Sequence, residues 1–508
     1  MNNKVYLVGA GPGDTGLLTL KGKSCIERAD VIVYDYLAAD ALLQYARKDA
    51  ELIYAGKKGG DHTLTQTEIN ALLVQKTLEG HTVTRLKGGD PFIFGRGGEE
   101  IEALIEAGIQ FEVVPGVTSA IAAPAYAGIP LTHRKFTSTV TFITGHENPD
   151  KEASSINWKA LADMGGTLVF LMGVKNLPNI TSRLRQQGAS ENTPVALVRW
   201  GTTSKQQAVT GTLATIIENV RTAGLTSPCI IVAGEVVALR EKMKWFENRP
   251  LFGKKIVVTR ARAQASDMVA RLTDLGAECL EYPVIKTVPP DDYARLDKAI
   301  NTLSGYHWII FTSVNGVDFF FNRLGENGYD ARALGGLRTA CIGPVTAERL
   351  KSHGIATDIL PDSFQAESII KAFKNEPLTG KRVLLPRAAE ARMILPEELS
   401  KMGAKVDEIA VYRTVDDTEH IDQLIRQLED QAIDLITFTS SSTVTNFKKL
   451  IPEDRFDALM EHTAIAAIGP ITAETADKNG FRVNISADTF TIPGLCDAIV
   501  RHYRNLNR

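Results

Sequence analysis

The chain has 508 residues, a formal net charge of −3 and 44% hydrophobic residues. This length predicts roughly three or four domains with ordinary packed cores, and the near-neutral charge argues against wholesale binding to nucleic acid. The five cysteines are scattered and form no CxxC pair, so we expect a reduced, cytoplasmic protein without a metal site. MNNK runs straight into an apolar stretch, so we expect no signal peptide, and no run is long enough for a membrane helix.

Strand-like and helix-like patterns alternate along the whole chain, which predicts an α/β fold. The strand patterns are KVYLVGAG, DVIVYD, VTRLKGGDP and TLVFLMGV in the first half, and KIVVTR, HWIIFTS, RVLLPR and DLITFTS in the second. A charged segment with Pro250 and Gly253 lies between the halves. We therefore predict domains over residues 1–245 and 253–508.

The first strand pattern ends in a glycine loop, VYLVGAGPGDTGLLTL. Gly9 and Gly11 fit the start of the dinucleotide fingerprint GxGxxG, but Asp14 stands where the third glycine belongs. Pro12 has no N–H to offer a phosphate, and Asp14 would repel one. The loop therefore favours a ligand without phosphate, or a structural turn, over NAD.

Two further stretches of the first half carry ligand-like features. RLKGGDPFIFGRGGEE crowds five glycines between a strand and a helix, where backbone can approach a ligand closely. Its cations Arg85, Lys87 and Arg96 suit carboxylates. The next stretch, VVPGVTSAIAAPAYAG, has Thr118 and Ser119 at a predicted helix start beside a wall of small residues.

Together with VIVYD, AGKKGG and the later RWGT, these motifs make the first half resemble uroporphyrinogen-III C-methyltransferases of the tetrapyrrole methylase family, which have two subdomains. The resemblance implies S-adenosyl-L-methionine as cofactor, a molecule without phosphate. It implies Asp35 as proton acceptor and Lys57 as proton donor. The implied cofactor-binding residues are Pro12, Gly88, Gly89, Asp90, Ile93, Thr118, Ser119, Met172 and Gly201.

The implied substrate carries acetate and propionate carboxylates, which need cationic partners. We expect some of this charge from cations beside the ligand-like loops, namely Arg85, Arg96, Lys58, Arg134 and Lys135. His133 is expected to be structural.

The second half contains an internal repeat. LGAECLEYPVIKT, from Leu275, recurs as MGAKVDEIAVYRT, from Met402, and IIFTS recurs as ITFTS at the same offset. CIGPVTAE likewise recurs as AIGPITAE. A constant offset of this length indicates a duplicated domain, and two such units commonly bind a ligand between them.

The repeated strand ends are rich in hydroxyl groups and arginine, without a nucleophile–base pair, which favours anion binding. With this repeat pattern, the second half resembles uroporphyrinogen-III synthase, whose two flavodoxin-like lobes exchange strands. The resemblance implies one lobe over residues 253–285 plus 415–508 and another over 287–410. It implies roles for Tyr412, Thr346 and Thr472, with Ser440 nearby; a core packing role for Tyr412 stays open.

The two resemblances imply an enzyme that cyclises hydroxymethylbilane to uroporphyrinogen III and methylates it twice to precorrin-2, as a homodimer through the methylase half. One alternative is a methylase of another precorrin position, or of RNA, fused to a two-lobed anion-binding domain. A second is a duplicated binding module without enzymatic activity. The sequence does not separate sirohaem from cobalamin as the final product.

Overall fold

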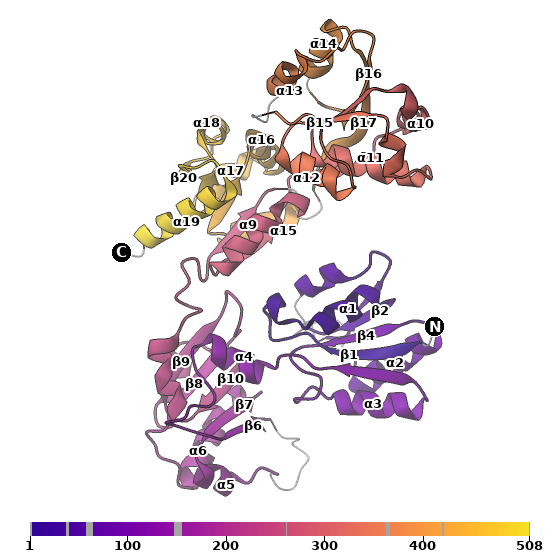
Figure 1. Ribbon diagram of the computed structural model, residues 1–508. Helices are drawn as coiled ribbons and strands as arrows, with labels where there is room; N and C mark the ends of the chain where they lie inside the picture. Colours follow the sequence, from indigo (N-terminus) through magenta and orange to yellow (C-terminus); the bar gives the residue numbers. More distant parts are fainter. Residues whose placement is uncertain are drawn as a thin grey trace. The chain divides into compact units, whose positions relative to one another are not determined.

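The computed structural model describes residues 3–36, 40–56, 64–146, 155–260, 262–361, 366–391, 393–418 and 421–506. Its backbone separates into two compact units. The first comprises Met1–Lys255 with Ala270–Cys279 and Val500–Arg508, and the second comprises Ile256–Val269 with Leu280–Ile499. Across all the described residues, the strands form four five-stranded sheets, flanked by helices (Figure 1). The predicted α/β class is confirmed.

The first sheet is entirely parallel, with the strand order β3-β2-β4-β1-β5. Its strands are β1 (Lys4–Gly9), β2 (Val31–Tyr34), β3 (Glu51–Tyr54), β4 (Val83–Lys87) and β5 (Gln110–Val114). Helix α1 (Leu20–Arg28) covers one face, and α2 (Gln66–Leu78) and α3 (Gly97–Glu106) cover the other (Figure 1). The loops that follow the strands therefore gather at one edge, the usual place for ligands in such sheets.

The face under α2 and α3 is apolar except at two positions of β4. Val5, Leu7 and Val83 are fully buried there. Alternate residues of a strand share a face, so Arg85 and Lys87 point to the same side as Val83, and both are buried. Two cations thus lie within this core.

The second sheet is mixed, with the order β6-β7-β10-β8-β9. Its strands are β6 (Val140–Thr144), β7 (Thr167–Leu171), β8 (Pro194–Arg199), β9 (Gln207–Thr212) and β10 (Cys229–Ala233). Its helices are α4 (Ser119–Tyr126), α5 (Trp158–Met164), α6 (Leu177–Gln186), α7 (Ile216–Thr222) and α8 (Arg240–Met243). The small residues Ala120 and Ala123 let α4 pack closely on one face.

The third sheet has the order β12-β11-β18-β19-β20. Its strands are β11 (Lys255–Val258), β12 (Glu278–Glu281), β18 (Leu435–Phe438), β19 (Ala464–Ala467) and β20 (Val483–Ser486). Around it lie α9 (Arg262–Asp274), α15 (Ile421–Glu429), α16 (Ser441–Leu450), α17 (Phe456–Met460), α18 (Pro470–Lys478) and α19 (Ile492–Leu506). Strands from two distant parts of the sequence therefore share one sheet.

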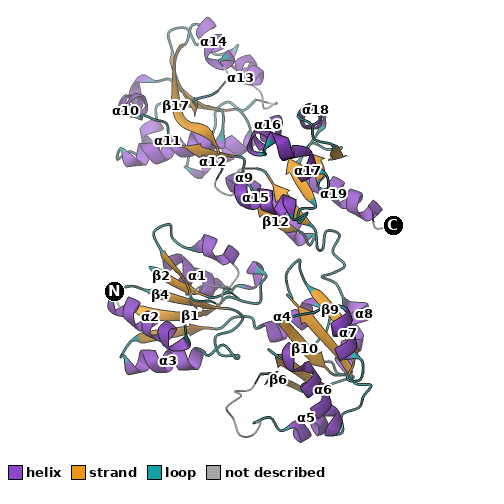
Figure 2. Ribbon diagram, turned by 180° about the vertical axis from the view of Figure 1, so that it is seen from behind, coloured by secondary structure: helices purple, strands orange, loops and turns teal. Residues whose placement is uncertain are grey.

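The fourth sheet has the order β13-β17-β16-β14-β15. Its strands are β13 (Ile285–Val288), β14 (Trp308–Phe311), β15 (Arg338–Cys341), β16 (Arg382–Ala388) and β17 (Lys405–Asp416). Its helices are α10 (Ala294–Asn301), α11 (Val314–Glu326), α12 (Pro344–Ser352), α13 (Ala366–Phe373) and α14 (Ile394–Lys401). β13 pairs antiparallel with the end of β17, the long curved strand in Figure 2.

Among the helices that the structure describes, none combines the length and the apolar character that crossing a membrane requires.

Candidate active sites

Four glycines bring three loops of the first sheet into direct backbone contact. Gly11 and Gly89 exchange two backbone hydrogen bonds, at 3.2 and 2.7 Å. A Cβ added at Gly116 would lie 2.3 Å from the Gly89 carbonyl oxygen, and one at Gly9 would lie 2.5 Å from the Gly116 Cα. Only glycine fits these positions, so the loops after β1, β4 and β5 form one compact backbone surface.

The Asp90 carboxylate connects two of these loops through hydrogen bonds to their backbone. Its Oδ1 accepts hydrogen bonds from the backbone N–H groups of Phe92 and Ile93, at 2.8 and 3.1 Å. Its Oδ2 accepts one from Gly116 N–H at 3.0 Å. Asp90 therefore organises the loops through main-chain donors.

The start of α4 adjoins the same surface. Thr118 caps the helix, its Oγ1 accepting from Ala120 N–H at 3.3 Å. A Cβ at Gly89 would lie 3.7 Å from the Thr118 Cα and 3.8 Å from the Ser119 nitrogen. The structure thus brings together Gly89, Thr118 and Ser119, which the sequence separates by about thirty residues.

Loops of the second sheet reach this region too. Asp14 N–H donates to Thr202 Oγ1 at 3.1 Å, and Asp14 Oδ2 accepts from the Tyr126 hydroxyl at 2.7 Å. Burial and the nearby Asp14 raise the pKa of Tyr126. A Cβ at Gly201 would lie 2.4 Å from the Ala123 Cβ. Gly201 is therefore held against α4, and the GPGD loop is anchored to both sheets.

Several residues in these loops have left-handed backbone conformations although they are not glycine. Met172, directly after β7, has φ +58°, and Trp200 and Thr202, after β8, have φ +48° and +74°. Phe94 and Arg96, before α3, have φ +54° and +57°. Such conformations are strained and cluster at ligand sites. The sequence carries no signal for them.

The glycine surface fits a cofactor without phosphate. Pro12 follows Gly11 directly, and Gly88 and Ile93 flank the Gly89–Asp90 turn. Ile93 and Met172 are 37% and 55% exposed, so apolar side chains stand open beside backbone polar groups. A flat apolar ring with polar edges can bind to such a surface. The individual cofactor contacts stay predictions.

Asp35 follows β2 at the same edge of the sheet. Its carboxylate Oδ2 lies 3.2 Å from Arg85 Nη2, and its side chain is 25% exposed. Asp35 is therefore accessible to a ligand at the ends of the strands, and its carboxylate is held by the buried Arg85. Lys57 and Lys58, the predicted donor and a predicted counter-charge, lie outside the described residues.

Arg85 differs from the sequence expectation that it meets substrate carboxylates. Its side chain is 4% exposed, and Nε lies 3.2 Å from Glu100 Oε1. Its Nη1 donates to the carbonyls of Val33 and Leu86. The guanidinium is buried between strand and helix because α3 supplies Glu100. By contrast, Arg96, Arg134 and Lys135 lie at exposed positions.

In the second unit, Tyr412 of β17 meets the first FTS loop. Its hydroxyl lies 3.1 Å from Ser313 Oγ, and its ring stacks on Phe319 with the centroids 5.5 Å apart. Burial raises the pKa of Tyr412, and the hydrogen bond with Ser313 opposes that rise. Near it, Arg387 is 5% exposed, and burial lowers its pKa. Tyr412 is thus both a packed core residue and part of a polar pair.

The repeated hydroxyl residues begin helices. Ser313 Oγ accepts from Gly316 N–H at 3.0 Å, and Ser440 Oγ accepts from Thr443 N–H at 3.3 Å. Thr346 and Thr472, in the first turns of α12 and α18, are 4% and 6% exposed. Sequence reasoning missed Ser313, which the repeat could have revealed, because it stands at the position of Ser440 in the other copy.

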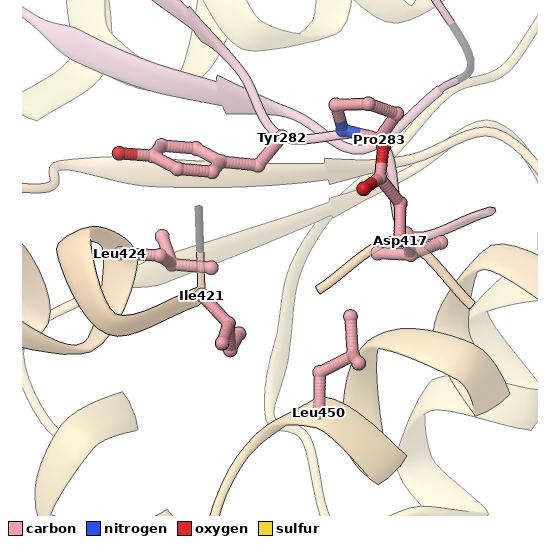
Figure 3. A pocket seen from close by; sticks show the side chains of 7 residues that line it. Tyr282, Pro283, Asp417, Ile421, Leu424 and Leu450 are labelled. Carbon is pink, nitrogen blue, oxygen red and sulfur yellow. The ribbon is translucent and has the colours of Figure 1, made fainter. Parts of the chain in front are cut away.

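An open crevice lies beside Tyr282, Pro283 and Val284, with α15 and α16 supplying further lining residues (Figure 3). Its lining comprises Tyr282, Pro283, Val284, Asp417, Ile421, Leu424 and Leu450. The lining is mostly apolar and its charged member is acidic, so it does not suit an anionic ligand. Within the described part of the chain, no cluster of His, Cys, Asp or Glu is arranged to hold a metal.

Comparison with known proteins places two families in succession. The family described as Tetrapyrrole (Corrin/Porphyrin) Methylases matches residues 4–217. The family described as Uroporphyrinogen-III synthase HemD matches residues 266–497.

Individual relatives agree. The chain is 39% identical to the porphyrin biosynthesis protein HemD of Ruminiclostridium josui, over 98% of this chain and 97% of that protein. It is 43% identical to a uroporphyrinogen-III C-methyltransferase of Bacillus subtilis, over 71% of this chain and 74% of that protein. Over 47% of this chain and 93% of the relative, it is 55% identical to an S-adenosyl-L-methionine-dependent uroporphyrinogen III methyltransferase of Methanosarcina barkeri. The chain belongs to the family of tetrapyrrole biosynthesis proteins in which a uroporphyrinogen-III C-methyltransferase is followed by a uroporphyrinogen-III synthase.

Proposed function

We propose that the second half closes hydroxymethylbilane to uroporphyrinogen III and that the first half methylates this product twice, giving precorrin-2. The observation that carries the proposal is the near full-length match to a porphyrin biosynthesis relative, with each half matched by its own family. The product of one half is then the substrate of the other. The proposed domains are residues 1–245 and 253–508, with the second divided into lobes over 253–285 plus 415–508 and over 287–410.

In the first half, the glycine surface and its neighbours hold S-adenosyl-L-methionine, which supplies a methyl group already activated on a sulfonium. The holding residues are Pro12, Gly88, Gly89, Asp90, Ile93, Thr118, Ser119, Met172 and Gly201. Because the cofactor is already activated, the protein's task is to align the centres and exclude water. Asp35 accepts the proton that leaves the macrocycle, and Lys57 donates one.

The carboxylates of the macrocycle are met by exposed cations of the same half. Arg96 directly precedes α3, two residues after the apolar Phe94, in the loop that follows Asp90. Arg134 and Lys135 follow the α4 segment. These side chains can approach an anionic ligand because they are exposed, unlike Arg85, although Arg96 also pairs with Glu99 at the surface.

In the second half, the two lobes fold the linear substrate so that the wrong ring closure is blocked. Tyr412, within β17, offers a hydroxyl pair with Ser313, and Thr346 and Thr472 stand in equivalent helix starts of the two lobes. Such conformational control depends on shape and anchoring rather than on a strong acid or base.

One incubation tests both reactions. Purified protein is given hydroxymethylbilane with and without S-adenosylmethionine, and the isomer composition and the methyl count are measured. The type III isomer and two added methyl groups are expected; the symmetric isomer would refute the synthase half, and an unmethylated product would refute the methylase half.

The proposal also includes a cytoplasmic homodimer that forms through the methylase half. The five cysteines are scattered along the sequence without a CxxC pair, which supports a reducing compartment. Light scattering of residues 1–245 and of the full chain gives the dimer test, since both should have twice their monomer mass.

A further inference from the structure

A cluster of buried charges lies behind Asp35, between β4 and α3. Glu100 of α3 is fully buried, and its Oε1 accepts from Lys87 Nζ at 2.6 Å and from Arg85 Nε at 3.2 Å. Gln66 of α2 donates to the same oxygen at 3.2 Å. Arg85 then reaches Asp35 with Nη2, at 3.2 Å. The cluster thus runs without interruption from the buried Lys87 to the partly exposed Asp35.

Among the described residues, the charges of this cluster balance when Asp35 is ionised. Arg85 and Lys87 bring two positive charges, and Glu100 brings one negative charge. All three side chains are at most 5% exposed. A buried charge without a counter-charge is costly, and the Asp35 carboxylate supplies the second negative charge.

Packing of this core does not require charged residues at these positions. Val5, Leu7 and Val83 fill the same face of the sheet, and apolar residues at the two cation positions would continue that core. Replacing a buried ion pair by apolar residues is often neutral or stabilising. The charged cluster is therefore better explained by its connection to Asp35 than by stability.

We propose that Arg85, Lys87 and Glu100 are positioning residues that keep the Asp35 carboxylate ionised and aimed at the substrate, and that they make it release an accepted proton readily. This inference rests on the proposed role of Asp35 as proton acceptor. When Asp35 takes a proton, the buried cluster keeps one unbalanced positive charge. That charge favours return of the proton, so Asp35 is reset for the second methylation.

Several elements bring charged or polar groups to the surroundings of Asp35. From β4 come Arg85 and Lys87, from α3 Glu100 and from α2 the neutral Gln66. From β3 comes the Tyr54 hydroxyl; a Cβ at Gly56 would lie 2.7 Å from both this hydroxyl and the Tyr36 nitrogen. Lys57 and Lys58 follow outside the described residues. Burial, with Arg85 nearby, lowers the pKa of Lys87, so its charge depends most on Glu100.

The test compares two substitutions with opposite electrostatic signs. Lys87→Met removes a positive charge, and Glu100→Gln removes a negative one. The pH profile of kcat for methylation of supplied uroporphyrinogen III is measured at saturating substrate. The acidic limb should move up by about one pH unit in the first variant and down by about one unit in the second. The double variant, again balanced, should return to within about 0.3 unit of wild type.

A merely structural role would lower the rate in each variant without opposite shifts of the limb, and that result would overturn the inference. Folding is followed by S-adenosylhomocysteine binding and by the cyclisation rate of the second half. If a single variant fails to bind, Gln66→Lys takes its place, because it adds a positive charge at a less buried position. Its acidic limb must then move down.

Asp35→Asn separates this inference from the function on which it rests. If Asp35→Asn keeps the wild-type turnover, Asp35 is not the proton acceptor and the proposed function of this residue fails. If Asp35→Asn is inactive while the limbs of the cluster variants stay at the wild-type pH, only the positioning role is overturned.

Discussion

The two halves of the chain differ in where the backbone leaves ordinary conformations. Among the described residues, five of the six non-glycine residues with positive φ lie in the methylase half, and the sixth is Gln431. Each such residue costs on the order of 1–3 kcal/mol. Met172 is itself a predicted cofactor residue, and the other four lie within three residues of Ile93 or Gly201. The methylase half therefore stores strain in the loops proposed to hold the cofactor.

The synthase half instead uses relaxed, repeated helix starts. Ser313 and Ser440 cap equivalent helices, and Thr346 and Thr472 are buried in equivalent first turns. This difference matches the chemistry proposed for each half. A small cofactor that carries its own activated group needs a rigid surface of fixed shape, whereas ring closure needs two lobes that bend a long substrate.

The largest difference between the two halves is expected from a substitution at Gly116. Gly116→Ala puts a Cβ 2.3 Å from the Gly89 carbonyl oxygen, where only backbone can give way. We expect a cost of about 1–3 kcal/mol in folding stability, and methyl transfer reduced at least ~100-fold because the loops move apart. S-adenosylhomocysteine binding by calorimetry should be lost, while cyclisation by the second half persists.

The matched control is Gly98→Ala, because a Cβ at Gly98 meets nothing within 4 Å. It should bind and methylate as the wild type does. Normal cofactor binding by Gly116→Ala would show that the close approach of the loops is irrelevant to the site.

Asp35→Asn gives the next largest effect. Loss of the proton acceptor should lower methylation by ~10²–10⁴-fold, with S-adenosylhomocysteine affinity and cyclisation unchanged. Radioactive methyl incorporation into supplied uroporphyrinogen III measures the rate. Asp49→Asn is the control, since this exposed carboxylate pairs with Arg47 on the surface. Equal rates in both variants would remove Asp35 from the mechanism.

Much of the fold was predictable because it depends on local pattern. KVYLVGAG and HWIIFTS contain β1 and β14, and both are apolar runs bounded by turn residues. The GxG loop and the FTS motifs stand where strands end, as their composition indicates. The long β17 is less evident, because its last residues, Arg413 to Asp416, pair with β13 only after folding.

The charged core of the methylase half was not predictable. In VTRLK, Arg85 and Lys87 alternate with apolar residues, which usually indicates a solvent-facing side. They are buried because Glu100 arrives from α3, a contact that no local pattern encodes. The left-handed Met172 and Trp200 also lack a signal, because residues other than glycine adopt positive φ only when tertiary contacts impose it.

A smaller effect is expected in the synthase half. Tyr412→Phe removes the hydroxyl that pairs with Ser313 at 3.1 Å. We expect cyclisation about tenfold slower, with more of the symmetric isomer, because one polar anchor of the substrate is lost. Methylation of supplied uroporphyrinogen III should not change. Chromatographic separation of the isomers provides the measurement.

Tyr306→Phe is the matched control, because Tyr306 lies just before β14 of the same sheet. Its hydroxyl donates to Asp407 at 2.6 Å, so this variant should lose about 1 kcal/mol of stability but keep the isomer ratio. If both variants gave only the type III isomer at the wild-type rate, Tyr412 would serve packing alone.

The smallest effect concerns the pH dependence of the methylase half. Hydrogen bonds from Lys21 and Lys4 to Glu112 of β5 lower the pKa of this carboxyl to about 2. A carboxyl with a depressed pKa stabilises the fold above its unfolded value, near 4.5, and this contribution is lost as the pH falls toward 2. Because solvent screens the pair, we expect only ~1 kcal/mol at pH 7. Glu112→Gln should therefore unfold at a lower urea concentration than wild type at pH 7. This difference in the urea midpoint should disappear near pH 2.5, and added salt should reduce it at pH 7. A difference in urea midpoint that stays constant with pH would show that the substitution acts through packing instead of charge. A change in the unfolding of the synthase half would show that the two halves do not unfold separately.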